Sequence, residues 1–170
     1  MNPTTGARSR TFRIAGKIDG IAELPDGRLA VLEYKTAGEE IGPDSPYWLR
    51  LRIDPQISLY VLAARAIGYD VSTVLYDVTR KPSIRLRKGE TPDQFGERLL
   101  QDLTDRPDFY FQRREIPRLE DDLAEFQREL WQQAKLLSDA RRFGRWFRSP
   151  GRFTCDQCAF ADLCLQSIRV

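Results

Sequence analysis

The sequence predicts a fold of the α/β (α+β) type, in which a mixed central sheet is flanked by helices. Apolar strand patterns open the chain, and a helix, a strand, a second helix, a further strand and a long amphipathic helix follow. The first helix is apolar nearly all round, which indicates burial against a sheet. Elements in this order build layers around a common core. The chain has 170 residues, 41% hydrophobic and 31% charged, so we expect a single domain over residues 1–170.

The N-terminal part is expected to form a hairpin. Residues 1–10 are polar and without periodicity, which is typical of disorder. Strands are then expected at residues 11–24 and 29–35. Between them, Pro25 has the φ angle that the first turn position requires, and Gly27 can adopt the left-handed conformation that closes a three-residue loop.

The length of this loop decides which side chains face each other across the hairpin. A three-residue loop places Asp19 opposite Glu33 on one face of the sheet, whereas a two-residue loop would place Asp19 opposite Tyr34. The two-residue period of a strand puts Lys35 on the same face as Glu33. Opposed carboxylates repel each other and need a cation, which Lys35 supplies and a divalent metal ion would supply more strongly. This cluster suggests a hydrolytic metal site.

The segment after the hairpin, residues 37–52, holds several Gly and Pro residues and is expected to be a loop over the site. Tyr47 and Trp48 would give that loop stacking surfaces. The next helix is expected to begin at Asp54, whose side chain suits an N-cap, and to end at Gly68.

The remaining elements follow from alternation, capping residues and helical spacing of leucines. We expect a strand at 71–78 with a candidate partner at 83–87, a helix from Thr91 to about 105, a strand at 108–116 and an amphipathic helix at 119–137.

Two of these segments resemble a known family. Asp19 followed by Glu33-Tyr34-Lys35 resembles the active-site hairpin of the PD-(D/E)XK nuclease superfamily, most closely its RecB-like and AddB-like branch. Gln56 and Tyr60 resemble the Gln-x-x-x-Tyr helix of that branch, and their spacing puts them on one helical face. The resemblance implies a restriction-endonuclease-like core.

The resemblance also implies a division of roles at the site. The ligands of a Mg²⁺ or Mn²⁺ ion would be Asp19, Glu33 and the backbone carbonyl of Tyr34. Lys35 would position a water molecule and stabilise negative charge, Gln56 would orient the nucleophile or substrate, and Tyr60 would support Gln56 or touch the nucleic acid backbone. Many relatives carry a further acidic residue or histidine on a helix before the hairpin. Few residues precede Asp19 here, so we expect an N-terminally shortened chain or a reduced subgroup.

Three cysteines lie near the C-terminus, at Cys155, Cys158 and Cys164. Their odd number and close positions disfavour a disulfide framework, so ligation is the better interpretation. Their spacing resembles the C-terminal triplet of iron-sulfur nucleases and implies three ligands of a [4Fe-4S] cluster, whose fourth cysteine is missing from this chain. Unligated thiols are one alternative. Zinc is the other, with Asp156 or Asp162 as the fourth ligand, because the chain has no histidine.

An arginine-rich segment, residues 140–153, precedes the cysteines. Aromatic residues are interleaved with its arginines, a composition typical of a track for single-stranded nucleic acid. Alternatively, the aromatic rings pack on the core while the arginines extend into solvent. The candidate nucleic-acid-binding residues are Arg141, Arg142, Arg145, Arg148 and Arg152.

The function that these observations favour is that of a metal-dependent DNA nuclease, a RecB-like exonuclease acting in recombination, repair, phage DNA processing or CRISPR adaptation. The net charge of +2 is too small to indicate nucleic acid by itself. We expect DNA with single-stranded character and a helicase or recombination protein as partners. No apolar run approaches the roughly 18 residues of a membrane span, so a cytoplasmic location is expected. The alternatives are a DNA- or helicase-binding module that does not cut, or a cluster-bearing subdomain of a larger helicase-nuclease.

Overall fold

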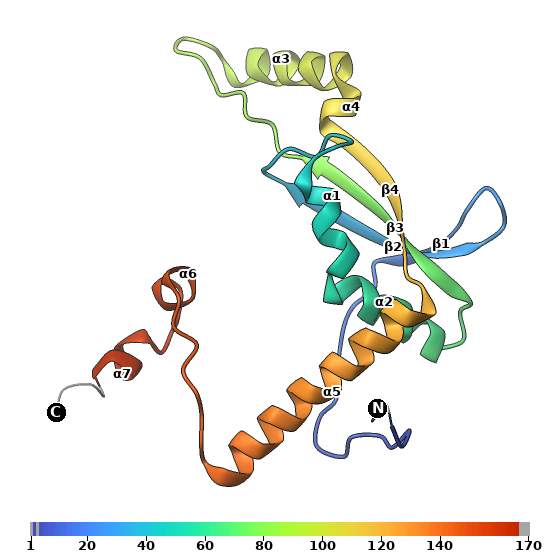
Figure 1. Cartoon of the computed structure of the whole chain (residues 1–170). Coiled ribbons are helices and arrows are strands. Elements are labelled where there is room, and N and C mark those ends of the chain that lie inside the picture. Colours follow the sequence, from blue (N-terminus) through green and yellow to red (C-terminus); the bar gives the residue numbers. More distant parts are fainter. Residues whose placement is uncertain (1, 3, 167–170) are drawn as a thin grey trace. The chain divides into compact units, whose positions relative to one another are not determined.

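The computed structural model describes residues 2 and 4–166 and divides into two compact units, residues 1–130 and 131–170 (Figure 1). The strands are β1 (Gly20–Glu23), β2 (Leu29–Ala37), β3 (Val71–Arg80) and β4 (Phe111–Pro117). The helices are α1 (Pro46–Arg50), the 3-10 turn η1 (Leu51–Ile53), α2 (Pro55–Ala66), α3 (Pro92–Asp105), α4 (Pro107–Tyr110), α5 (Glu120–Phe143), α6 (Arg152–Asp156) and α7 (Ala161–Gln166). None of the helices in the described part is long and apolar enough to cross a membrane.

The four strands form one mixed sheet in the order β1-β2-β3-β4. β2 and β3 are parallel, and the two outer strands are antiparallel to their neighbours. The parallel pair needs a crossover, which α1, η1 and α2 provide. The predicted fold class, a mixed sheet flanked by helices in a restriction-endonuclease-like arrangement, is confirmed.

The hairpin has the register that a three-residue loop dictates. Gly27 has a φ of 83°, and the Leu24 N–H donates to the Arg28 carbonyl oxygen at 2.8 Å. The ladder ends where Gly20 faces Leu32, so the next position outward sets Asp19 opposite Glu33.

The first strand is shorter than the predicted residues 11–24, since β1 begins at Gly20. The reason lies at the next rung of the ladder. The Asp19 carboxylate accepts the Tyr34 N–H at 3.0 Å, and so takes a hydrogen bond that a longer strand would have used.

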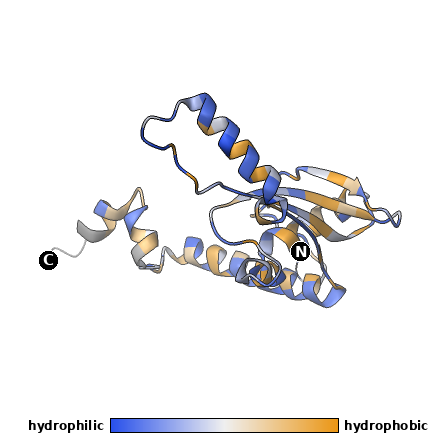
Figure 2. Ribbon diagram, turned by 90° about the horizontal axis from the view of Figure 1, so that it is seen from above, coloured by the Kyte–Doolittle hydropathy of each residue, from blue (hydrophilic) through white to orange (hydrophobic). Residues whose placement is uncertain are grey.

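One face of the sheet carries the core. Alternate β2 residues, among them Val31, pack there with α2 and with buried residues of β3. Figure 2 shows apolar residues gathered on the strands of the sheet. On the opposite face, Tyr34 is exposed beside Asp77 of β3 and Arg113 of β4, which form an ion pair.

The predicted loop at residues 37–52 is partly wrong, because it contains α1 and η1. Trp48 is not a free stacking surface. Its indole N–H donates to the Ile41 carbonyl oxygen at 2.8 Å and its ring is buried in the core, with the half-buried Tyr47 packed against it edge-on. A ring that can bury its area and satisfy its N–H gains more from the core than from solvent.

Residues 83–87 do not form the expected strand. β3 is already paired with β2 on one side and β4 on the other, so no edge is left for them. The last rung is the Lys81 N–H, which donates to the Ala37 carbonyl oxygen at 2.7 Å, and Pro82 then lacks an N–H.

The later elements match the predictions more closely. The helix from Thr91 is confirmed as α3, with Thr91 and Gln94 forming a capping box. The strand expected at 108–116 begins only at Phe111, because α4 occupies the residues before it. The helix expected at 119–137 begins at Glu120 and continues to Phe143.

Candidate active site

Glu33 and Lys35 project from β2 on the side that α2 covers. Glu33 is only 3% exposed, which is unusual for a carboxylate. The Lys35 ammonium donates to Glu33 Oε1 and forms an ion pair with it. The sequence prediction that these two side chains share a face is confirmed.

The second carboxylate oxygen of Glu33 lacks a partner. Oε2 is buried and accepts no hydrogen bond from any described residue. A buried, unpaired carboxylate oxygen is costly, so the site calls for another donor or a cation. The residues around Glu33 therefore fit a divalent metal ion.

Asp19 lies at the end of the hairpin, one residue before the last pair of the ladder, in which Gly20 faces Leu32. Its carboxylate is held by the Tyr34 N–H. A strand residue directs its N–H and its carbonyl to the same neighbouring strand, so the Tyr34 carbonyl faces the side of Asp19. The two carboxylates and this carbonyl provide the hard oxygen donors that Mg²⁺ and Mn²⁺ prefer.

The charge of Lys35 is stabilised by this arrangement. Partial burial of the ammonium acts to lower its pKa, but the hydrogen bond and charge of Glu33 outweigh burial and raise it, with smaller contributions from Tyr60 and Asp19. Lys35 is therefore a cation at neutral pH, within the electrostatic reach of all three groups.

Helix α2 supplies the polar pair that the spacing predicted. The Asp54 side chain caps the helix by accepting the Gln56 N–H at 2.7 Å. One turn along, Gln56 Nε2 donates to the Tyr60 hydroxyl at 2.9 Å. The Tyr60 ring lies against Gly16, where an added Cβ would come within 3.1 Å of the ring. The chain before the hairpin is thus in contact with α2.

Two further buried residues at this face were not predicted. Tyr76 of β3 lies beside Glu33 in the register, and its pKa is raised by burial and by a hydrogen bond with Tyr47. Arg118 follows β4 and is only 3% exposed. The parallel pairing of β2 and β3 would have revealed Tyr76, but no sequence signal marks Arg118.

Arg118 anchors the N-terminal end of α2. Its guanidinium donates to Ser58 Oγ at 2.8 Å, to the Leu51 carbonyl oxygen at 2.7 Å and to the Asp54 carbonyl oxygen at 3.1 Å. Burial lowers the pKa of Arg118, while the nearby Asp122 and Asp54 act to raise it. The arginine fixes the helix that carries Gln56 and Tyr60.

The arginine-rich segment belongs to the unit of residues 131–170. Its aromatic rings are exposed, and the Arg142 guanidinium lies 5.2 Å from the centre of the Phe143 ring. This exposure favours a stacking surface over packing of the rings on a core. The exposed rings are Phe143, Trp146, Phe147 and Phe153. The Arg152 side chain lies outside the described part of the chain.

Cys155, Cys158 and Cys164 are exposed and form no disulfide. In the described part of the chain, no group of three or more His, Cys, Asp and Glu side chains could hold a metal ion. The iron-sulfur cluster therefore stays a prediction, as do the alternatives of zinc and unligated thiols.

Comparison with known proteins identifies the family. A family model described as the PD-(D/E)XK nuclease superfamily matches residues 3–165, a span that includes the sheet, α2 and the cysteines. No curated protein and no solved structure matches the chain.

Proposed function

The chain belongs to the PD-(D/E)XK nuclease superfamily, and from that membership we propose that it is a metal-dependent DNA nuclease with its site at Asp19, Glu33 and Lys35. The observation that carries this proposal is the buried Glu33 oxygen without a partner, beside a lysine and opposite a second carboxylate. Such a constellation has a clear use in phosphodiester hydrolysis and little use in a structural role.

The residues of the site divide the work of the reaction. Asp19, Glu33 and the Tyr34 carbonyl would hold Mg²⁺ or Mn²⁺, which supplies a Lewis acid for the phosphate and a lower pKa for bound water. Lys35 places a positive charge where negative charge develops on the phosphate oxygens. Gln56 and Tyr60 form a hydrogen-bonded pair that can orient the attacking water or the substrate.

The finer form of the proposal is a RecB-like exonuclease, cytoplasmic and acting in recombination, repair, phage DNA processing or CRISPR adaptation. The exposed aromatic rings among arginines support a substrate with single-stranded character. A helicase or recombination protein would supply such DNA. The cysteine triplet would hold an iron-sulfur cluster whose fourth cysteine is missing from this chain.

The experiment that tests the proposal is a titration with Mn²⁺ on end-labelled single-stranded and duplex DNA. We expect cleavage by the wild type and none by Glu33→Ala. Glu23→Ala is a matched control, because it removes an exposed carboxylate from the same hairpin. Equal cleavage by the wild type and the Glu33 variant would refute the site. Visible absorbance of protein prepared without oxygen reports the cluster separately.

A second candidate function is a module that binds DNA or a helicase without cutting. The observation that favours it is the small number of acidic ligands, since the site offers two carboxylates and the described residues hold no larger group. If the protein binds DNA but does not cleave it at any Mn²⁺ concentration of the titration, this alternative is established.

A further inference from the structure

In the connection between β3 and β4, residues 81–106 form an arm that extends past the end of the sheet and carries α3 (Figure 1). None of the α3 residues is buried. The arm therefore contributes little to the core, although its helix is well capped. An ordered segment with so little burial is suited to an outward contact.

The first half of the arm is strongly basic. Residues 81–89 contain no acidic residue, and their cations Lys81, Arg85, Arg87 and Lys88 are exposed. None of these four side chains has an ion-pair or hydrogen-bond partner in the described part of the chain. Four unpaired cations in a short extended segment create a positive potential that attracts a polyanion.

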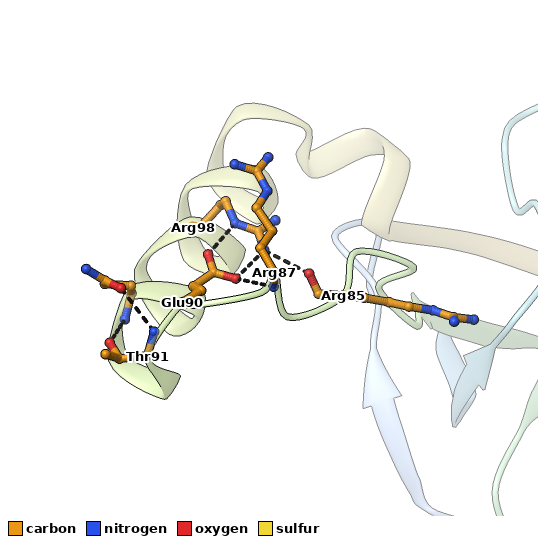
Figure 3. A network of polar contacts seen from close by, with 6 residues as sticks. Arg85, Arg87, Glu90, Thr91 and Arg98 are labelled. Carbon is orange, nitrogen blue, oxygen red and sulfur yellow. Dashed lines mark hydrogen bonds and ion pairs between the residues drawn. The ribbon is translucent and has the colours of Figure 1, made fainter.

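The acidic residue that follows the basic segment, Glu90, is paired with Arg98 of α3. Glu90 accepts hydrogen bonds from Arg98 Nε and Nη2, both at 2.8 Å, and from the Arg87 N–H at 2.8 Å (Figure 3). Arg98 Nη2 also donates to the Arg85 carbonyl oxygen at 2.9 Å. Arg98 thus fixes the backbone of the basic segment and leaves the side chains of Arg85 and Arg87 unpaired. In Figure 3 the Arg85 side chain points away from this network.

The base of the arm is also fixed. Two guanidinium groups lie over the Phe109 ring, that of Arg80 at 4.1 Å and that of Arg106 at 4.5 Å from its centre. The buried Tyr110 donates to Asp102, which also pairs with Arg106 at 2.6 Å. The arm is therefore anchored to the sheet, and a fixed set of cations binds with a smaller loss of conformational entropy.

We propose that this arm binds the phosphodiester backbone of the DNA on which the active site acts, and the inference rests on the proposed nuclease function. Arg80, at the base of the arm, pairs with Ala37, four residues beyond Glu33 on β2. At about 3.3 Å per strand residue that separation is about 13 Å, or roughly four nucleotides at 3.4 Å each. Cations that succeed one another along an extended segment match the regularly spaced phosphates of a nucleic-acid strand.

The test compares two variants that each lose two positive charges. The arm variant is Arg87→Gln/Lys88→Gln, which keeps the Arg87 N–H for Glu90. The control variant is Arg128→Gln/Lys135→Gln, two exposed cations of α5. Fluorescence anisotropy in Ca²⁺ with oligonucleotides of about 4 and about 15 nucleotides gives Kd as a function of salt.

We expect the arm variant to bind the longer oligonucleotide roughly tenfold more weakly, with a salt slope smaller by roughly 1.4 for single strands or 1.8 for duplex. The control variant should bind as the wild type does, and neither variant should change the affinity for the shorter oligonucleotide. Equal losses in both variants, or wild-type binding by the arm variant, would overturn the proposal and leave an acidic protein as the partner to consider.

Hydrolysis of bis(p-nitrophenyl) phosphate separates this inference from the proposed function, because so small a substrate cannot reach the arm. Hydrolysis that is lost in Glu33→Ala but unchanged in the arm variant supports both statements. If the wild type fails to hydrolyse this ester and DNA but the arm variant still loses DNA affinity, the nuclease function is wrong while the arm contact stands.

Discussion

Replacement of Arg118 tests how the sheet positions the helix that carries Gln56 and Tyr60. Arg118→Met keeps an apolar stem of similar length but removes the guanidinium. Three acceptors in η1 and at the start of α2 then lose a donor, namely the Ser58 hydroxyl and the carbonyl oxygens of Leu51 and Asp54, and so does the adjacent Pro117 carbonyl oxygen. Each such loss costs about 1–3 kcal/mol.

The net cost is smaller than the sum of these losses, because the variant no longer buries a cation that lacks a carboxylate partner. We therefore expect the free energy of unfolding to fall by about 3 kcal/mol. For a unit of this size, a loss of 1 kcal/mol lowers Tm by about 3–4 °C, so Tm should fall by about 10 °C.

Circular dichroism during heating measures this shift, and Arg113→Met is the matched control. Arg113 lies within β4, the strand that Arg118 follows, but it is exposed, and its ion pair with Asp77 should be worth at most about 1 kcal/mol. Arg118→Lys should be intermediate, since an ammonium cannot span the three acceptors. If Arg118→Met unfolds at the same temperature as Arg113→Met, the account of Arg118 as the anchor of α2 is refuted.

Three further predictions follow from single groups. Glu33→Gln should raise Tm in the absence of metal, since it removes a buried negative charge with an unpaired oxygen. In a thermal-shift assay it should also abolish the stabilisation that we expect Mn²⁺ to give the wild type, and a Mn²⁺ response equal to that of the wild type would contradict this. Gly16→Ala should destabilise by about 1 kcal/mol, because its Cβ would press on an α2 ring at 3.1 Å, whereas Gly20→Ala meets ordinary contacts and is the control. The pKa of Glu90 should be about 2 in a carbon-13 NMR titration, because the hydrogen bonds from Arg98 lower it. The contribution of Glu90 to stability is therefore complete above pH 4.5 and is lost as the pH falls through about 2. Arg98→Met should return this pKa toward 4.5, and an unchanged pKa would refute the contact between Arg98 and Glu90 as its cause.

Local rules were sufficient for the register of the hairpin. A glycine able to adopt a positive φ at position 27 closes a loop of one defined length, and from that length the opposition of Asp19 and Glu33 follows. The Gln56 and Tyr60 pair was equally accessible, because helical spacing alone places the two side chains in contact.

Features that depend on contacts distant in sequence were not accessible in this way. The local sequence around Trp48 predicts an aromatic residue in a loop, and only the fold shows that the core buries its ring. The expected strand at residues 83–87 fails because β4, much later in the chain, takes the remaining edge of β3. Arg118 reaches Ser58 and Leu51 across a separation in sequence that no local pattern encodes.

The helix-covered face of the sheet buries two charges, and the difference between them is informative. The Arg118 guanidinium has oxygen acceptors for both its Nε and its Nη groups, so its burial is compensated within the fold. Glu33 has one oxygen bound by Lys35 and the other without a partner. Ser45 and Thr73 also carry unpaired buried oxygens, but these are neutral hydroxyls and cost far less. The fold thus gives every nitrogen of the buried guanidinium a hydrogen-bond acceptor but leaves one oxygen of the buried carboxylate without a donor, and that difference is what the proposed metal ion would explain.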